Sequence, residues 1–168
     1  KVEVYRDGGK YSQEYVRGKK QAAVKKVGNS KLHGTVVTFK PDAQIFAERS
    51  YDWVRIVNHL RGQAYLVRGL KIRIIDLRGY DKKIDAEAGL YLKELELESP
   101  SHTFYFEGGL VSLVTFYNQT EKPIHETIFY VEKEHNGVQV EVAFQYIDDI
   151  TAREVGFTNN TATPEGGM

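Results

Sequence analysis

The sequence predicts an α+β fold in which a mostly antiparallel sheet is covered by helices. Short segments of alternating β-branched and aromatic residues, separated by turns that contain glycine, favour strands. Two later segments, residues 51–66 and 110–118, instead repeat apolar residues at intervals of three and four, which is typical of amphipathic helices. Four strands in the first forty residues, followed by these helices, indicate layers of sheet and helix.

The first strands are expected at residues 2–6 and 11–16, joined by a hairpin turn at Asp7-Gly8-Gly9-Lys10, with a weaker strand at 22–27. Residues 35–39 form the strongest strand pattern, because they are all β-branched or aromatic and lie between Gly34 and Pro41. We predict that this segment is a central strand of an antiparallel meander.

The predicted central strand presents two different faces. Thr35, Val37 and Phe39 point one way, and Val36 and Thr38 the other, because side chains alternate along a strand. A hydroxyl above a small apolar surface suits an aromatic ring with polar edges. From these residues alone, a core strand whose Thr35 hydroxyl bonds only to backbone is the preferred interpretation.

The first predicted helix has Trp53, Ile56 and Leu60 on one side, with Ser50 as its N-cap and Gly69 as its C-terminal stop. We expect it to lie on the first sheet. A strand follows at 70–76, with Ile72 and Ile74 facing inward.

Beyond residue 90, strands are expected at 95–98 and 104–107, followed by the helix at 110–118. Asn136-Gly137 predicts a hairpin between strands at 127–133 and 138–146, and residues 154–158 could add a third strand. Composition changes near Gly109, where we place a domain boundary. Three strands and one helix do not close a domain, so the second domain is expected to be cut short.

Composition excludes several classes of function. The chain has 168 residues, 41% hydrophobic and 27% charged, without an apolar run near the roughly 18 residues of a membrane span. Lys plus Arg and Asp plus Glu are equal at 23 each, so no overall field attracts nucleic acid, and any DNA contact would be local. The absence of cysteine excludes thiolate chemistry and fits a cytoplasmic protein.

No metal site or catalytic triad can be assigned from the spacing of residues. The five histidines do not have metal-ligand spacing, and no loop of the phosphate-binding type occurs. A solvated strand face is preferred over a cation site for Glu94, Glu96 and Glu98. Solvation is likewise preferred over phosphate contact for the basic cluster of Lys19, Lys20, Lys25 and Lys26.

Several blocks of residues, taken in order, resemble a known family. They are Val4-Tyr5-Arg6-Asp7-Gly8, residues 34–42, Gly69-Leu70-Lys71-Ile72, Phe106-Glu107-Gly108-Gly109, residues 141–146, and Asn159-Asn160 with Glu165-Gly166-Gly167. This order resembles the ATPase subunits (the B subunits) of the bacterial type IIA topoisomerases, DNA gyrase and topoisomerase IV. The chain departs from the family pattern at Lys19-Lys20, where a proline is usual, and at Met168.

The resemblance implies that residues 1–109 are the C-terminal half of a GHKL-type ATPase domain and that 110–168 begin a transducer domain. It implies a parent protein that couples ATP binding and hydrolysis to DNA duplex passage, with ATP and Mg²⁺ as cofactors. The implied partners are DNA, the A subunit of the topoisomerase and a second copy of the B subunit, and no membrane.

The resemblance also implies roles for three residues. Thr35 would contact the adenine through its hydroxyl, Val37 would line the same pocket, and Arg6 would lie at the pocket mouth, where aminocoumarin inhibitors bind. No catalytic residue and no metal ligand is assigned. The family's general base, Mg²⁺ ligand and lid would precede Lys1, so we expect this chain to be a fragment without ATPase activity of its own.

Two other interpretations are considered. One is a sheet-and-helix module that recognises a protein partner and binds no nucleotide. The other is a mismatch-repair or chaperone relative in the same ATPase superfamily, which the Glu-Gly-Gly and Asn-Asn blocks disfavour.

Overall fold

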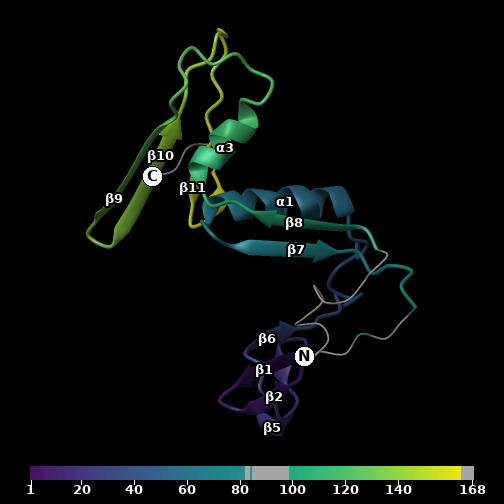
Figure 1. Ribbon diagram of the computed structural model, residues 1–168. Coiled ribbons are helices and arrows are strands. Elements are labelled where there is room, and N and C mark those ends of the chain that lie inside the picture. The colour runs from purple at the N-terminus through teal and green to yellow at the C-terminus, as the bar shows by residue number, and fades with distance from the viewer. Residues whose placement is uncertain (82–83, 85–98, 164–168) are drawn as a thin grey trace. The chain divides into compact units, whose positions relative to one another are not determined.

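The computed structural model describes residues 1–81, 84 and 99–163, and these form two compact units. The first unit comprises Lys1–Tyr51 with Leu77–Ser99, and the second comprises Asp52–Asp76 with Pro100–Met168. All strand pairs of the described residues are antiparallel, and two helices accompany them, which confirms the predicted fold class (Figure 1). No helix in the described part of the chain is long and apolar enough to cross a membrane.

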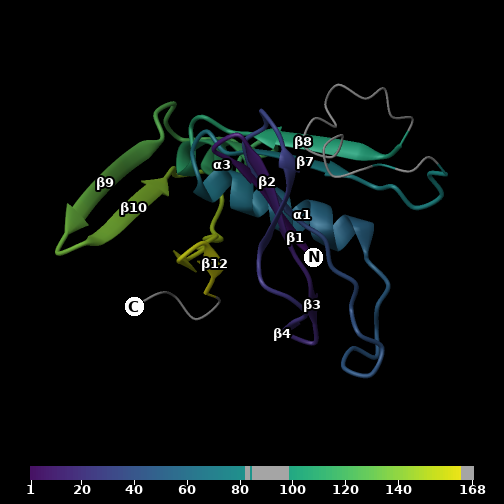
Figure 2. The same ribbon diagram turned by 90° about the horizontal axis from the view of Figure 1, so that it is seen from below.

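The first unit contains a four-stranded sheet in the order β5-β2-β1-β6. Its strands are β1 (Val2–Arg6), β2 (Gly9–Gln13), β5 (Lys25–Asn29) and β6 (Gly34–Val37). Asp7 and Gly8 join β1 to β2 with positive φ values of 51° and 72°, as a two-residue hairpin turn requires. A separate small hairpin pairs β3 (Tyr15–Val16), at the end of the strand predicted at 11–16, with β4 (Lys19–Lys20) (Figure 2).

The strand predicted to be central lies at the edge of this sheet. β1 pairs with both β2 and β6 and therefore occupies the inner position. Val37 is 65% exposed and Phe39, beyond the end of β6, is 73% exposed. A run of β-branched residues indicates a pleated segment, but it does not specify how many neighbours that segment pairs with, so this prediction was wrong.

Two residues of β1 form the buried face of the first sheet. Tyr5 is fully buried, and Glu3 is 6% exposed. The ammonium groups of Lys1 and Lys10 lie 3.4 Å and 3.6 Å from Oε1 of Glu3, so the buried carboxylate is paired, as burial of a charge requires.

The second unit begins with helix α1 (Trp53–Leu66). Its N-cap is Asp52, whose Oδ1 accepts a hydrogen bond from the Arg55 amide at 2.9 Å. The predicted cap, Ser50, instead donates its amide to Glu48 at 2.7 Å. Both residue types can cap a helix, and the helix starts after the second of them.

The observed partners of α1 all lie in the second unit. The helix packs on β7 (Lys71–Ile75) and β8 (Ser101–Tyr105), which belong to its own unit, and its expected place on the first sheet stays a prediction. Helix α3 (Leu110–Tyr117) also contacts α1, and its position confirms the predicted second helix. The predicted strand at 95–98 lies outside the described residues, as do Glu94, Glu96 and Glu98.

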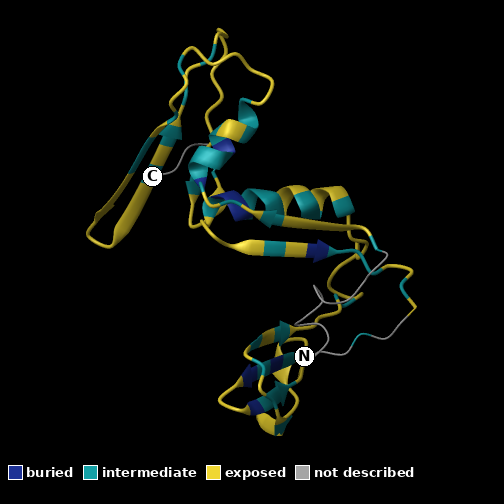
Figure 3. Cartoon of the chain, in the orientation of Figure 1, coloured by how far each residue is buried: buried dark blue, intermediate teal, exposed yellow. Residues whose placement is uncertain are grey.

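Few residues of the second unit are fully buried (Figure 3), and aromatic rings pack among them. The Tyr65 ring stacks on Phe106 with centroids 3.8 Å apart and an interplanar angle of 12°, and lies 5.8 Å from Phe116. Tyr65 therefore joins α1 to the end of β8 and to α3. The buried hydrophobic residues described in this unit are Ala64, Tyr65, Ile74 and Leu113.

The hairpin predicted at Asn136-Gly137 is confirmed. It joins β9 (Phe129–His135) to β10 (Val138–Phe144), with φ values of 51° and 77° at its two turn residues. The predicted third strand does not extend this pair: β11 (Phe157–Thr158) pairs with β12 (Thr161–Ala162). The compact units divide the chain at other positions than Gly109, and the domains 1–109 and 110–168 stay a prediction.

We expect Tyr65→Ala to lower the free energy of unfolding by about 3–5 kcal/mol, because it removes a large ring from a packed core. Val54→Ala is the matched control on the same helix, since Val54 is 65% exposed, and it should change the value by less than about 1 kcal/mol. Chemical denaturation measures both. Equal effects of the two substitutions would contradict the assignment of Tyr65 to the core.

Candidate functional site

The register of the first sheet brings the three sequence-predicted site residues onto one face. Val4 lies opposite Thr35, and Val2 opposite Val37. Directly opposed residues of an antiparallel pair share a face, and alternate residues of one strand do so as well. Arg6 is two residues beyond Val4 on β1, so it shares this face with Thr35 and Val37.

This face is open in the chain, whereas the other face of the sheet holds the buried Glu3 and Tyr5. Thr35 and Val37 are exposed. The Arg6 side chain is 66% exposed, and its Nε lies 3.0 Å from Oδ2 of Asp7. The face therefore combines a hydroxyl, an apolar surface and, at the end of the strand, a guanidinium.

A polar contact fixes the segment that follows β6. Arg17, in the turn between β3 and β4, donates from Nε to Oδ2 of Asp42 and from Nη2 to Oε1 of Gln44 at 2.5 Å. The Gln44 amide donates to Oδ1 of Asp42 at 2.9 Å. The pKa of the Asp42 carboxyl is lowered below its ordinary value. The hydrogen bond from the Gln44 backbone amide is the larger cause, and the hydrogen bond from Arg17 is the second.

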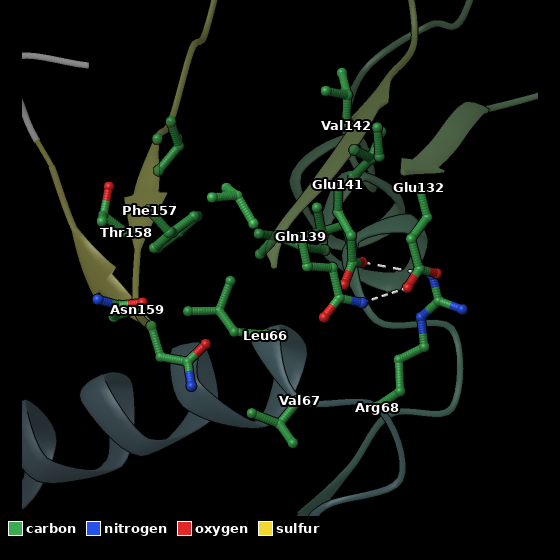
Figure 4. Close-up of a pocket in the computed structure, with 18 of the residues that line it drawn as sticks. Leu66, Val67, Arg68, Glu132, Gln139, Glu141, Val142, Phe157, Thr158 and Asn159 are labelled. Atoms are coloured by element: carbon green, nitrogen blue, oxygen red, sulfur yellow. Dashed lines mark hydrogen bonds and ion pairs between the residues drawn. The ribbon is translucent and has the colours of Figure 1, made fainter. Parts of the chain in front are cut away.

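The second unit contains a pocket of about 1090 Å³. It lies between the C-terminal end of α1, helix α3, the β9–β10 hairpin and the residues around β11 (Figure 4). Leu66, Leu113 and Phe157 supply apolar walls, and Arg68, Glu132 and Glu141 supply charge. Thr35, Val37 and Arg6 do not line this pocket.

The charged wall of the pocket is a cluster that the sequence did not predict. Arg68 Nη2 lies 3.5 Å from the carboxylates of both Glu132 and Glu141 and donates to the Tyr130 hydroxyl. Arg68 is 73 positions from Glu141, and no periodicity links residues at that distance. The hairpin register was the one signal that could have indicated a cation here. It places Glu132 opposite Glu141, and two like charges side by side favour a positive partner.

No group of three or more His, Asp or Glu side chains in residues 1–81, 84 and 99–163 has the arrangement of a metal site. Within this range no set of side chains is arranged to hold Mg²⁺, so its ligands would have to come from other residues of the whole protein.

Comparison with protein families adds a second line of support. The family model described as DNA gyrase B matches residues 109–168. The chain is 36% identical over 167 residues to the DNA gyrase B subunit of Halalkalibacterium halodurans, which covers 99% of this chain and 23% of that protein. It is 38% identical over 173 residues to the DNA gyrase B subunit of Thermotoga maritima, with 99% and 24% covered.

A solved structure is similar to the chain as well. The 43K ATPase domain of Thermus thermophilus gyrase B, in complex with an aminocoumarin, matches with a TM-score of 0.76 and 28% identity. The match covers 96% of this chain and 39% of that one. The resemblance to the ATPase subunits of type IIA topoisomerases is confirmed, and the chain spans about a quarter of the length of the two curated relatives.

We expect Arg17→Gln to raise the pKa of Asp42 while leaving it below its ordinary value, because the Gln44 amide remains. Since the folded-state pKa is lowered, the contribution of the carboxylate to stability is present above its unfolded-state pKa and is lost as pH falls through the folded-state pKa. A carboxyl-detected NMR titration measures this pKa. Arg6→Gln is the matched control, and an equal shift in that variant would contradict the pairing.

Proposed function

We propose, on the premise that this chain is related to the B subunits of DNA gyrase, that it contributes part of the ATP site of a type IIA topoisomerase. The whole protein would couple ATP binding and hydrolysis to the passage of one DNA duplex through another. The relationship extends over 99% of the chain and includes a solved ATPase domain. A protein-interaction module that binds no nucleotide is not favoured by these similarities.

One observation carries this proposal: the register of β1 and β6 gives Arg6, Thr35 and Val37 a common face. Thr35 would hydrogen-bond the polar edge of the adenine through its hydroxyl, and Val37 would pack against the ring. Arg6, at the end of β1, would lie at the mouth of the site. The openness of the face supports these roles, because a ligand must reach it.

The proposed cofactors are ATP and Mg²⁺. The residues described here would orient the base of ATP, and a general base and a metal ligand would have to come from residues other than these three. Bound ATP would supply the phosphoryl group, and its transfer to water would drive the cycle of DNA duplex passage.

The proposed partners are DNA, the A subunit of the topoisomerase and a second copy of the B subunit. The balanced charge of the chain, 23 basic and 23 acidic residues, is consistent with DNA contacts made mainly by other parts of the assembly.

Thr35→Val should weaken ATP binding to the intact protein by about fivefold, because it removes one hydrogen bond of roughly 1 kcal/mol. Thr38→Val is the matched control: Thr38 follows β6 directly, and its backbone amide donates to Lys1 O at 2.9 Å. Fluorescent-nucleotide titration measures both affinities. If Thr38→Val weakens binding as much as Thr35→Val, the assigned face is wrong.

Arg6→Gln should weaken binding of an aminocoumarin by about tenfold, since hydrogen bonds to charged groups contribute roughly 1.5–3 kcal/mol. ATP affinity should change less, because Arg6 is placed at the mouth and away from the base. Calorimetric titration of Arg6→Gln with each ligand measures whether aminocoumarin affinity falls more than ATP affinity. Unchanged aminocoumarin affinity would remove Arg6 from the site.

A further inference from the structure

Arg68 lies at the corner of the tight turn that links α1 to β7. The Leu70 amide donates to the Val67 carbonyl at 3.1 Å and closes the turn, and Gly69 has a positive φ of 72°. These features are those of a type II turn, which places Arg68 at its first central position. The turn is held to the end of β8 by the Gly69 amide, which donates to Phe106 O at 3.4 Å.

The stem of Arg68 crosses the backbone of Gly109, just before α3. A Cβ atom at Gly109 would lie 2.8 Å from Cγ of Arg68, and Gly109 has a positive φ of 55°. Only glycine combines this backbone conformation with so close an approach. The direction of the Arg68 side chain is therefore set by its own turn and by the backbone at Gly109.

The guanidinium of Arg68 ends beside one carboxylate from each strand of the β9–β10 hairpin, those of Glu132 and Glu141 (Figure 4). Glu132 and Glu141 face each other across the pair, a like-charge arrangement that is destabilising by itself. Arg68 lies 3.5 Å from each carboxylate. The Cζ atom of Arg68 also lies 4.6 Å from the centre of the Tyr130 ring. The guanidinium therefore makes a cation–π contact in addition to its two ion pairs.

An isolated exposed ion pair contributes little, and these side chains are 26–42% exposed. The cluster differs because the two carboxylates repel each other whenever the guanidinium is absent. The position of the hairpin that keeps Arg68 between them is thus favoured over other positions. Tyr130 strengthens this preference, since its hydroxyl lies 2.9 Å from Glu132 and 3.1 Å from Glu141.

We propose that Arg68, Tyr130, Glu132 and Glu141 form a latch that holds the β9–β10 hairpin at a fixed position relative to α1. Arg68 is a positioning residue in this latch. Resting on the proposed function, the latch joins the predicted ATPase domain, which contains Arg68, to the predicted transducer domain, which contains the other three residues. It makes ATP hydrolysis productive for DNA passage by keeping that junction stiff.

The first test measures, in the intact protein, how rigidly the β9–β10 hairpin is held relative to α1. The 168 residues contain no cysteine, and any cysteine elsewhere in the intact protein is first replaced by serine, so spin labels at His59→Cys on α1 and Glu134→Cys on β9 report one distance. Both positions are exposed. Arg68→Gln should broaden the distance distribution, and Arg73→Gln, which removes an exposed charge from β7, should leave it narrow. An unchanged width in Arg68→Gln overturns the latch.

Glu141→Gln is the second variant, to be used if Arg68→Gln does not fold. It keeps Arg68 but removes one of its two carboxylate partners, and it also relieves the like-charge repulsion. The distance distribution should then be broader than in the wild type. A cooperative thermal unfolding transition shows that the variant is still folded. A wild-type width overturns the proposal in this variant too.

The second test measures coupling, as the ratio of ATP molecules hydrolysed to DNA passage events. Arg68→Gln should raise this ratio by about fivefold, the lower range of typical coupling between sites, with an unchanged KM for ATP. A normal ratio despite a broadened distance distribution overturns the coupling role. If the wild-type protein neither binds ATP nor passes DNA, the proposed function fails, and the distance measurement still decides the latch.

Discussion

The packing of the Tyr65 ring on Phe106 is the contact on which the second unit depends. This ring lies at the last turn of α1, and its neighbours come from the end of β8 and from α3. Burial raises the pKa of the Tyr65 phenol, as expected for a group withdrawn from water. Because α1 is held at this point, the turn that follows it, and with it Arg68, has a defined position.

The first unit is organised by a contrast between the two faces of its sheet. One face buries Tyr5 and the ion-paired Glu3, and the other leaves Thr35, Val37 and Arg6 open. A small sheet with a single buried face has one surface available for binding. The proposed nucleotide contacts use that surface, so the fold of this unit and its proposed role are compatible.

Arg68 shows how a few polar groups can fix a junction that has little core. The exposed sides of the β9–β10 hairpin include Val138, Val140 and Val142, so apolar burial alone does not hold the hairpin within this chain. A cation between two carboxylates gives a directional contact, which apolar packing lacks. Gly109 makes room for this contact by having no side chain of its own.

The sequence by itself determined the local elements. Asp7-Gly8 and Asn136-Gly137 specify their hairpins because both residues of such turns need positive φ, and the three-to-four spacing of apolar residues specifies α1 and α3. The alternation along residues 35–37 also placed Thr35 and Val37 on one side. Tertiary structure alone decided that β6 is an edge strand, that α1 packs on β7 and β8, and that Arg68 meets Glu132 and Glu141. Backbone chemistry within a few residues encodes turns and periods, whereas pairing between distant segments depends on the free energy of the whole packed arrangement.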